Sequence, residues 1–326
     1  MAAAKITFVF CVESGQLESM TLRSIQSLRR WGGGMAQSPV IAVKPRFGPP
    51  LDRQTLKRFS ELGVRYLDVR PTRKYRWYHF LNKPSALLAA NENATTELVA
   101  WMDSDVLFVG EPNDYLLSPE YDIAAYAPNG WIATSGPGDR NEPFWVAVCK
   151  SLSIDIDQLP YVQTEEDNRR VRLYWNAGIF AYRRETDYAR AYRDYCVRLL
   201  DAHVAHREKK LFYHEQLAMA LAGAKLRWRQ MARSHNFTME AWSGRTFAPE
   251  QLETARVIHY HDFAQAVNHE RFVTILRQAF PDVADFLEQS GPIRGRTTRR
   301  NSWMRSGLHM IRGIQQRKHL WHCQSY

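Results

Sequence analysis

Two carboxylates, Asp103 and Asp105, interrupt an otherwise apolar segment of the chain. The residues before them, 98–102, and after them, 106–109, have the composition of buried strands. A carboxylate at the edge of an apolar core is costly unless a positive group neutralises it. Acids at i and i+2 after a strand can converge on one divalent cation, whose open positions can hold a diphosphate. A polar turn is the alternative, but the strand-like residues on both sides favour a metal site.

The segments that must position these acids alternate between strand-like and helix-like patterns. Runs of β-branched and aromatic residues predict strands, and apolar residues at 3.6-residue spacing predict helices. We expect a strand over 5–12, a helix over 16–31, a strand over 40–43, a helix over 54–62 and a strand over 64–69. This alternation indicates an α/β fold with a mostly parallel central sheet and helices on both faces.

Basic and aromatic residues are interleaved between Arg70 and Lys83. Such a stretch can bind single-stranded nucleic acid by charge and stacking. It can equally frame a nucleotide diphosphate, or cover a core with amphipathic side chains. Pro84 then suits the first turn of a helix over 85–91 that leads to the strand before Asp103.

The pattern beyond the two acids is less regular. We expect strands over 121–126, 174–182, 226–231 and 256–260, and helices over 186–208, from 214 onward, and over 263–289 with a break at Pro281. The polar segment 151–172 has no clear periodicity, so we expect a long loop of the kind that forms binding lids.

Four segments in this order resemble a known family. They are Asn82-Lys83-Pro-Ser-Ala-Leu-Leu, Trp101-Met-Asp103-Ser-Asp105-Val-Leu-Phe, Asn176-Ala-Gly178-Ile-Phe and Val257-Ile-His259-Tyr-His261. Together, over roughly residues 5–262, they resemble nucleotide-sugar glycosyltransferases of the GT-A fold, most closely the retaining family that contains glycogenin and the bacterial lipopolysaccharide galactosyltransferases. Because many GT-A families share the Asp-x-Asp motif, the resemblance is more specific for the fold than for the family.

The resemblance implies a metal site. In such enzymes the Asp-x-Asp pair and a late histidine hold manganese, or magnesium, on the diphosphate of a UDP-sugar. Carried over, the ligands are Asp103, Asp105 and His259. His261 competes with His259, because alternate residues of a strand share a face. An imidazole beside two carboxylates suits manganese better than oxygen ligands alone would.

The resemblance also implies donor-binding and catalytic residues. Lys83 corresponds to a basic residue near the donor, and Asp103 and Ser104 belong to the donor site. The segment at Val12 and Glu13 contacts the uracil nucleoside. The catalytic residues that the resemblance implies are Asn176, which lines the sugar pocket, Glu215 and Gln216.

Two departures from the family pattern affect these roles. The family follows its late histidine with Gly-x-x-Lys-Pro-Trp, whose lysine reaches the diphosphate, whereas this chain has Tyr260-His-Asp-Phe-Ala-Gln. Arg271 or the basic C-terminal tail are candidate substitutes. The family's Asp-Gln-Asp at a helix start is His214-Glu215-Gln216 here, which fills two of the roles approximately: an acid that orients hydroxyls and an amide near the anomeric carbon. A helix-capping role for Glu215 is the alternative.

The positive charge is concentrated in the C-terminal tail. The formal net charge is +10, and the segment 291–326 holds eight Arg or Lys and no Asp or Glu. We therefore divide the chain into a GT-A domain, 1–290, and a basic tail, 291–326. In a helix over 302–315, one face would carry Trp303, Met304, Leu308, Ile311 and Ile314, with Arg305 and Arg312 off that face.

Such a basic amphipathic helix is typical of a segment that lies on an anionic membrane surface. The alternative is that its apolar stripe packs on the domain and its arginines remain in water.

The remaining composition narrows the setting. The four cysteines are far apart and form no Cys-x-x-Cys pair, which favours free thiols in a reducing compartment. The first residues are too short and strand-like for a signal peptide. We therefore expect a cytoplasmic enzyme, peripheral on the inner face of the membrane where its tail binds.

The predicted function is metal-dependent sugar transfer, with retention, from a nucleotide-sugar donor to a glycan, lipid-linked or small-molecule hydroxyl, without nucleic acid as a partner. A sugar-1-phosphate nucleotidyltransferase is the nearest rival, but the segment after the first strand lacks the basic residues of that class. A nucleic-acid-binding protein would leave Asp103 and Asp105 unexplained.

Overall fold

The computed structural model describes residues 5–69, 74–243, 247–263, 265–295 and 298–326. Within these residues, seven strands form the central sheet in the order β11-β6-β9-β4-β1-β2-β3. The β1–β2, β2–β3, β1–β4 and β6–β11 pairs are parallel, and β9 runs antiparallel to both β4 and β6. The predicted mostly parallel sheet is confirmed.

The strands are short. Their bounds are β1 (Ile6–Cys11), β2 (Val40–Lys44), β3 (Val64–Asp68), β4 (Leu98–Met102), β5 (Val106–Phe108), β6 (Ile123–Ala125), β7 (Tyr161–Gln163), β8 (Arg170–Arg172), β9 (Ile179–Arg183), β10 (Val204–Ala205), β11 (Trp228–Gln230), β12 (Phe237–Thr238), β13 (Val257–His259) and β14 (Gln324–Ser325). A second sheet, β12-β13-β5, lies where β4 ends, and β5 pairs antiparallel with β13.

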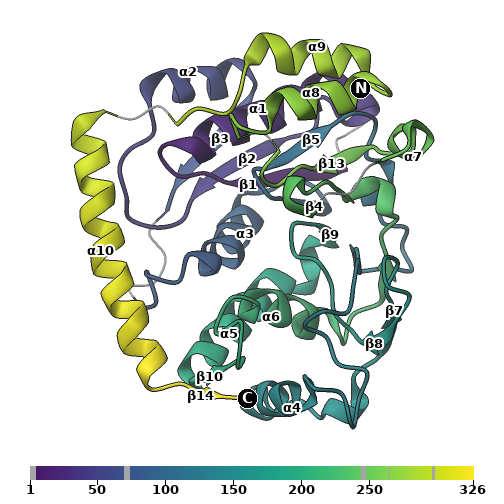
Figure 1. Cartoon of the computed structure of the whole chain (residues 1–326), viewed down its shortest axis with the longest axis vertical. Coiled ribbons are helices and arrows are strands. Elements are labelled where there is room, and N and C mark those ends of the chain that lie inside the picture. Colours follow the sequence, from purple (N-terminus) through teal and green to yellow (C-terminus); the bar gives the residue numbers. More distant parts are fainter. Residues whose placement is uncertain (1–4, 70–73, 244–246, 264, 296–297) are drawn as a thin grey trace.

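Helices cover both faces of the central sheet. Their bounds are α1 (Gln16–Trp31), α2 (Arg53–Glu61), α3 (Asn82–Asn93), α4 (Glu142–Leu152), α5 (Tyr188–Asp201), α6 (His214–Gly223), α7 (Pro249–Glu253), α8 (His269–Arg277), α9 (Pro281–Ser290) and α10 (Arg299–Trp321). Because side chains alternate across a strand, Val9 of β1 packs in a core with α3, α5 and α6, whereas Phe8 and Phe10 pack in a second core with α1 and α2. A third core joins α8 and α9 to the second sheet (Figure 1).

The structure corrects four of the expected elements. The strand expected over 174–182 is limited to β9, and the helix expected over 263–289 begins only with α8 at His269. The segment 151–172 is not a loop without secondary structure, because β7 and β8 form an antiparallel hairpin in it. Strands of three residues are too short to produce a readable period. The helix expected over 186–208 ends at Asp201, because His203 takes a left-handed backbone conformation with φ 53° and the chain continues into β10.

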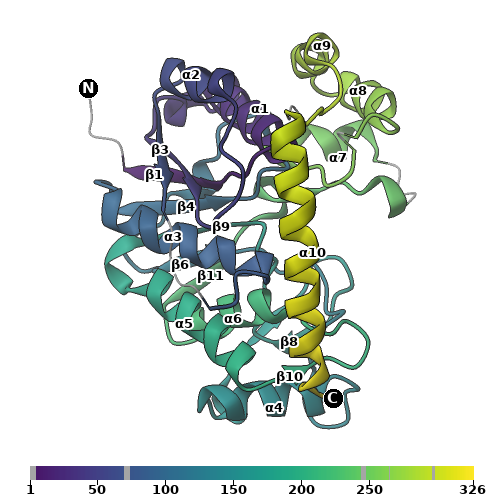
Figure 2. The ribbon, with the colours of Figure 1, turned by 90° about the vertical axis from the view of Figure 1, so that its left-hand side faces the viewer.

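The helix α10 stands apart from these layers and runs along one side of the molecule (Figures 1 and 2). It is longer than the helix expected over 302–315, and β14 beyond it pairs in parallel with β10. The alternative to membrane binding, in which the apolar stripe packs on the domain while the arginines stay in water, does not describe this helix. Trp303, Ile311 and Ile314 are exposed, whereas Arg305 and Arg312 donate hydrogen bonds to the domain.

No helix in the described part of the chain combines the length and the apolar composition that crossing a membrane requires.

Candidate active site

Asp103 and Asp105 lie in the turn between β4 and β5, at the carboxyl end of β4. Two backbone hydrogen bonds bring distant segments to this turn. The Asp103 N–H donates to the carbonyl of Gly178 over 2.8 Å, and the Tyr260 N–H donates to the carbonyl of Asp105 over 3.0 Å. The entry to β9 and the exit from β13 therefore meet at the two acids, at the edge of the sheet where this class of fold binds ligands.

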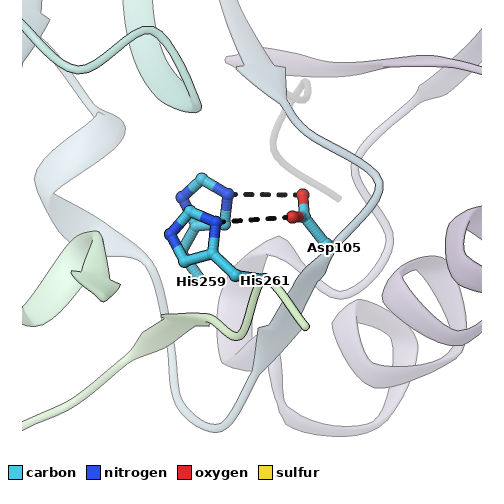
Figure 3. Close-up of side chains that lie close together, drawn as sticks. All are labelled: Asp105, His259 and His261. Carbon is cyan, nitrogen blue, oxygen red and sulfur yellow. Dashed lines mark ion pairs between the residues drawn. The ribbon is translucent and has the colours of Figure 1, made fainter. Parts of the chain in front are cut away.

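Asp105, His259 and His261 form a group whose ligand atoms all lie within 4.8 Å of one another. Nε2 of His259 is 3.3 Å from Oδ1 of Asp105, and Nδ1 of His261 is 3.8 Å from Oδ2. The two imidazole rings stack with centroids 4.0 Å apart, and both point toward the same carboxylate (Figure 3). The structure thus brings together both histidines that compete for the metal in the sequence.

His261 reaches this position through a turn and not through strand alternation. β13 ends at His259, and His261 has a left-handed backbone with φ 46°. A residue other than glycine in this conformation costs free energy that the surrounding structure must supply, and such residues cluster at functional sites. Both rings face Asp105, as expected. The expected reason is wrong, because His259 and His261 are not alternate residues of one strand.

A chain of three hydrogen bonds connects the ring of His259 to the backbone of Gly178. Oδ1 of Asn236 lies 3.3 Å from Nδ1 of His259, and Nδ2 of Asn236 donates to Oδ1 of Asn176 over 3.1 Å. The same Asn176 oxygen accepts the Gly178 N–H over 2.8 Å. With Nδ1 engaged by Asn236, the Nε2 atom of His259 is the one directed at Asp105, which is the arrangement typical of a metal-binding histidine.

The charges of the group are mutually dependent. Burial opposes ionisation of Asp105, but the charge and hydrogen bond of His259 and the charge of His261 lower the pKa of Asp105 to about 2. Burial also lowers the pKa of His259, yet Asp105 overrides this and the net shift of that pKa is upward. Burial and the neighbouring His259 lower the pKa of His261 to about 3. One carboxylate therefore stabilises one protonated imidazole in the absence of another cation.

This donor set fits a divalent metal. Asp105 offers a carboxylate oxygen, and both histidines offer ring nitrogens that are unprotonated when they bind a metal. A set with two imidazoles suits a first-row transition ion such as manganese better than it suits magnesium, which prefers oxygen ligands.

Asp103 lies outside this group, and both of its oxygens have other partners. Oδ1 accepts the indole N–H of Trp101 over 2.8 Å and lies 3.1 Å from Nζ of Lys83, and Oδ2 lies 3.3 Å from the same nitrogen. Lys83 also donates to the carbonyl of Ala177 over 2.6 Å. The expected role of Asp103 as a metal ligand stays a prediction.

Lys83 links Asp103 to Glu215, whose Oε1 is 3.7 Å from Nζ. Glu215 lies in the first turn of α6 with only 2% of its surface exposed. Burial raises the pKa of Glu215 to about 7, although the charge of Lys83 opposes the rise. Gln216, the next residue, accepts the Tyr174 hydroxyl through Oε1 over 2.5 Å.

A cavity of about 790 Å³ opens beside the two acids, within the size range of small-molecule sites. Its described lining includes Glu13, Lys83, Asp103, Ser104 and Asp105. The lining found in the described residues does not include Val12, Asn176, Glu215, Gln216 or His259. Val12 is buried and Glu215 meets the site through Lys83, while Asn176 and His261 line a smaller cavity of about 280 Å³.

Other side-chain contacts of the site could not be predicted from the sequence. Glu13 is held by Arg46, with Nη2 of Arg46 2.7 Å from Oε2, and by Nδ2 of Asn82 over 3.0 Å. Asn236 and Trp101 orient His259 and Asp103 as described. Arg46 and Asn236 lie outside the motif segments and were not predicted, and the roles of Asn82 and Trp101 within those segments became clear only from their contacts. Of the basic and aromatic stretch, Arg70 and Arg73 lie outside the described residues.

Known protein families and solved structures include matches to this chain. The family model described as Rhodobacterales glycosyltransferase domain matches residues 8–227. No curated protein matches the chain. The structure of the bifunctional glycosyltransferase WbbM superposes with a TM-score of 0.51 at 13% identity, over 84% of this chain and 49% of WbbM.

Two further structures give lower scores. The galactosyltransferase LgtC has a TM-score of 0.49 at 13% identity, over 86% of this chain and 95% of LgtC. The glycosyltransferase GlyE of Streptococcus pneumoniae TIGR4 has a TM-score of 0.44 at 14% identity, over 79% of this chain and 55% of GlyE. The chain thus spans about half the length of WbbM and GlyE. The likeness to WbbM supports the expected GT-A fold.

Gly178 provides a test of how tightly the site is packed. A Cβ atom at this position would lie 2.3 Å from Cε1 of His259 and 2.8 Å from Oδ1 of Asn176. We expect Gly178→Ala to lower the free energy of unfolding by about 1–3 kcal/mol through overpacking, measured by urea denaturation. The matched control is Gly307→Ala, where a Cβ meets nothing within 4 Å and helix propensity predicts equal or slightly higher stability. Equal stability of the two variants would contradict the proposed close contact.

The raised pKa of Glu215 predicts a pH-dependent stability. The folded protein keeps a proton on Glu215 up to about pH 7, whereas the unfolded chain loses it near the ordinary value of 4.5. The free energy of unfolding should therefore fall as the pH rises between these values, by about 3 kcal/mol. Glu215→Gln, which stays neutral, should lack this loss. Urea denaturation of both proteins in EDTA at about pH 5 and about pH 8 measures the difference; parallel pH dependences would refute it.

Proposed function

The chain belongs to the Rhodobacterales glycosyltransferase domain family and is a glycosyltransferase, and from this premise we propose a specific reaction. The protein transfers a sugar from a nucleotide diphosphate donor, a UDP-sugar, to a hydroxyl group of a glycan or lipid-linked acceptor. The reaction is metal-dependent and retains the anomeric configuration. The donor, the metal and the retention follow from the resemblance to the glycogenin family, and the donor set of Asp105, His259 and His261 supports the metal.

The observation that carries this proposal is the cavity beside the two acids. It is lined by cationic side chains and by Asp103 and Asp105, and Asp105 belongs to the group with His259 and His261. Carboxylates beside a site for a negatively charged diphosphate would repel it unless a cation lies between them. A metal-bound nucleotide diphosphate accounts for the acids and for the cations of the cavity together.

The metal would be held by Asp105, His259 and His261, with Asp103 as the further ligand that the motif predicts. When bound, a divalent ion neutralises the charge that develops on the departing diphosphate.

Lys83 is the residue of the chain that is placed to stabilise the leaving group. Burial lowers its pKa, but the carboxylates of Asp103 and Glu215 raise it, and the net shift is upward. Lys83 therefore stays protonated and fixed at the cavity wall, a preorganised positive charge of the kind that stabilises developing negative charge. Glu215, out of contact with the cavity, acts as a positioning residue through Lys83.

The smaller cavity provides a place for the acceptor. It is lined by Trp131, Glu166, Asn176, Glu240 and His261, among other residues. Trp131 is 55% exposed, and an aromatic ring beside carboxylate and amide groups suits a sugar with its apolar faces and its hydroxyls. Asn176 and His261 connect this cavity to the group around Asp105, so an acceptor hydroxyl there would lie beside the donor site.

The reaction is tested by incubating the protein with manganese and a panel of UDP-sugars. We expect slow hydrolysis of one of them, which EDTA abolishes, and NMR should show that the released sugar first has the anomeric configuration of the donor. Asp105→Asn and Asp103→Asn should each reduce turnover by roughly a thousandfold or more, because each removes a charge that the transition state requires. Unchanged turnover in either variant would contradict the metal assignment.

The contributions of His259 and His261 to metal binding can be distinguished by the manganese concentration that each alanine variant requires for activity. Nε2 of His259 is closer to Asp105 and is oriented by Asn236, so His259→Ala should raise the manganese concentration for half-maximal activity more than His261→Ala. The reverse order would make His261 the more important of the two histidine ligands and contradict this ranking.

We also propose that the outer face of α10 contacts an anionic membrane, as an enzyme with a lipid-linked acceptor would require. Trp303, Met310, Ile314 and Trp321 are exposed, and their spacing of seven, four and seven residues places them on one face of the helix. Trp303 and Trp321 are 81% and 87% exposed. Arg299, Arg300 and Lys318 lie on the same helix, a composition that favours binding to anionic lipid. Arg296 of the tail lies outside the described residues.

Co-sedimentation with vesicles tests the membrane contact. Replacement of Trp303 and Trp321 together by Ser should weaken binding to anionic vesicles by at least about tenfold. The control is Trp131→Ser, which removes an exposed tryptophan from another surface. Neutral vesicles should bind poorly, and added salt should weaken the contact. Binding that is equal in all three proteins, or that does not depend on lipid charge, would exclude this role.

A further inference from the structure

The inner face of α10 forms one wall of the large cavity. Six residues of the helix line it together with the acids of the turn: Arg305, Leu308, His309, Arg312, Gly313 and Gln316. Steps of three and four residues place them on one helical face, opposite the exposed tryptophans. A helix from the C-terminal tail thus borders the same space as Asp103 and Asp105, about two hundred residues earlier in the chain.

The helix is fixed at both ends, so this wall belongs to the fold. Before it, Ile293 is buried in the core with α8 and α9, and the carbonyl of Arg294 accepts the Ser19 hydroxyl over 2.8 Å. At its end, His319 packs against Trp77 and His203 with ring centroids 4.9 Å and 4.5 Å away. The strand β14 then pairs with β10. The helix therefore spans from the α8–α9 side to the α4–α5 side of the cavity (Figure 2).

The charges around the cavity do not balance. Among the described residues that line it, Lys44, Arg46, Lys83, Arg305 and Arg312 are cationic, and Glu13, Asp103 and Asp105 are anionic. Three of the cations are paired: Arg46 with Glu13, Lys83 with Asp103, and Lys44 with Asp68 over 3.1 Å. Asp105 faces the two histidines.

The two arginines of α10 that line the cavity, Arg305 and Arg312, form hydrogen bonds only to uncharged groups in the described part of the chain. Nη2 of Arg305 donates to the carbonyl of Ser14 over 2.7 Å and lies 3.5 Å from its hydroxyl, and Nη2 of Arg312 donates to the carbonyl of Phe47 over 2.5 Å. A guanidinium has five N–H donors. Carbonyl contacts use few of them and leave the positive charge unneutralised.

We propose that Arg305 and Arg312 bind the diphosphate of the donor nucleotide. This assignment rests on the proposed function, since it takes the large cavity as the donor site. It gives α10 a part in the active site, where it supplies the cationic groups that the segment after His259 lacks. Guanidinium groups are suited to this because their planar fork matches phosphate oxygens.

The surroundings of Arg312 agree with an anion site. Burial lowers the pKa of its guanidinium, and the charges of Arg46 and Arg76 lower it further, against an opposing effect of Glu13. Positive groups that crowd one another in this way gain stability when an anion arrives between them. Arg305 is also placed closely, because its guanidinium packs against the backbone of Gly15. A Cβ atom at Gly15 would lie 2.4 Å from Nη2 of Arg305.

The other candidate cation lies elsewhere. Arg271 contacts the carbonyl of Ala241 and the ring of Phe263, and it is not among the described residues that line the large cavity. Of the two substitutes considered for a diphosphate-binding lysine, the structure favours the tail.

The test compares nucleotide binding by arginine variants on the two faces of α10. Calorimetry would measure the Kd of UDP, with GDP and ADP as alternatives, and of uridine, in the presence of manganese. The full-length proteins are wild type, Arg305→Gln, Arg312→Gln and the matched control Arg317→Gln. Arg317 is exposed and is not among the described residues that line this cavity. Arg305→Lys keeps the charge but loses the fork.

We expect Arg305→Gln and Arg312→Gln each to weaken UDP binding by about tenfold or more, because each removes a charge-assisted contact. Arg317→Gln should bind UDP like the wild type, and Arg305→Lys should fall between Arg305→Gln and the wild type. The affinity for uridine, which has no phosphate, should be the same in all proteins. A variant that merely disturbed the cavity wall would weaken uridine and UDP alike.

Two results would overturn the assignment, and they differ in meaning. If the wild type binds UDP and both glutamine variants bind it equally well, or lose uridine binding in parallel, α10 does not contact the phosphates while the proposed function stands. If the wild type binds none of the three nucleoside diphosphates, the proposed donor site and this inference fail together.

Discussion

The site depends on how negative charge is held at the end of a buried strand. β4 is apolar and fully buried, and the chain leaves it directly into Asp103 and Asp105. Carboxylates in such a place require positive partners. Asp103 obtains Lys83 from α3, and Asp105 obtains two histidines from the end of β13. The need to neutralise two acids thus joins the first half of the sheet, the helix before β4 and the last strand of the domain into one structure.

Backbone packing sets how closely these partners approach. The turn is tied to Gly178 and Tyr260 by main-chain hydrogen bonds, and the lack of a side chain at Gly178 leaves room for His259 and Asn176, both of which a Cβ atom there would meet. Asn236 forms hydrogen bonds with both Asn176 and His259, so the position of Asn176 helps to fix the ring of His259. The orientation of the imidazole is therefore a property of the core around it, and such preorganisation is what a catalytic metal site requires.

The sequence predicted most of the fold because long periodic segments carry their own signal. The helix over 16–31 and the strands before and after the two acids were found within about a residue of their observed ends. The hairpin of β7 and β8 was missed, because three-residue strands have no readable period. At the site, motif positions such as Asp105 and His259 could be named, whereas Asn236 and Arg46 acquire their contacts only through tertiary packing. His261 came close to Asp105 through a left-handed residue, which no alternation rule predicts.

The helix α10 shows why a one-faced interpretation of an amphipathic segment can fail. From the sequence, its apolar stripe was expected either to lie on an anionic membrane surface or to pack on the domain with the arginines in water. In the structure, neither group of residues packs in the core of the domain. Arg305 and Arg312 line the cavity, and Trp303 and Trp321 are exposed on the other side of the helix. Because the helix is held at its ends by Ile293 and β14, its middle does not need an apolar face against the domain. Both faces are then available for binding, and on our two proposals α10 would connect the donor cavity with an anionic membrane surface.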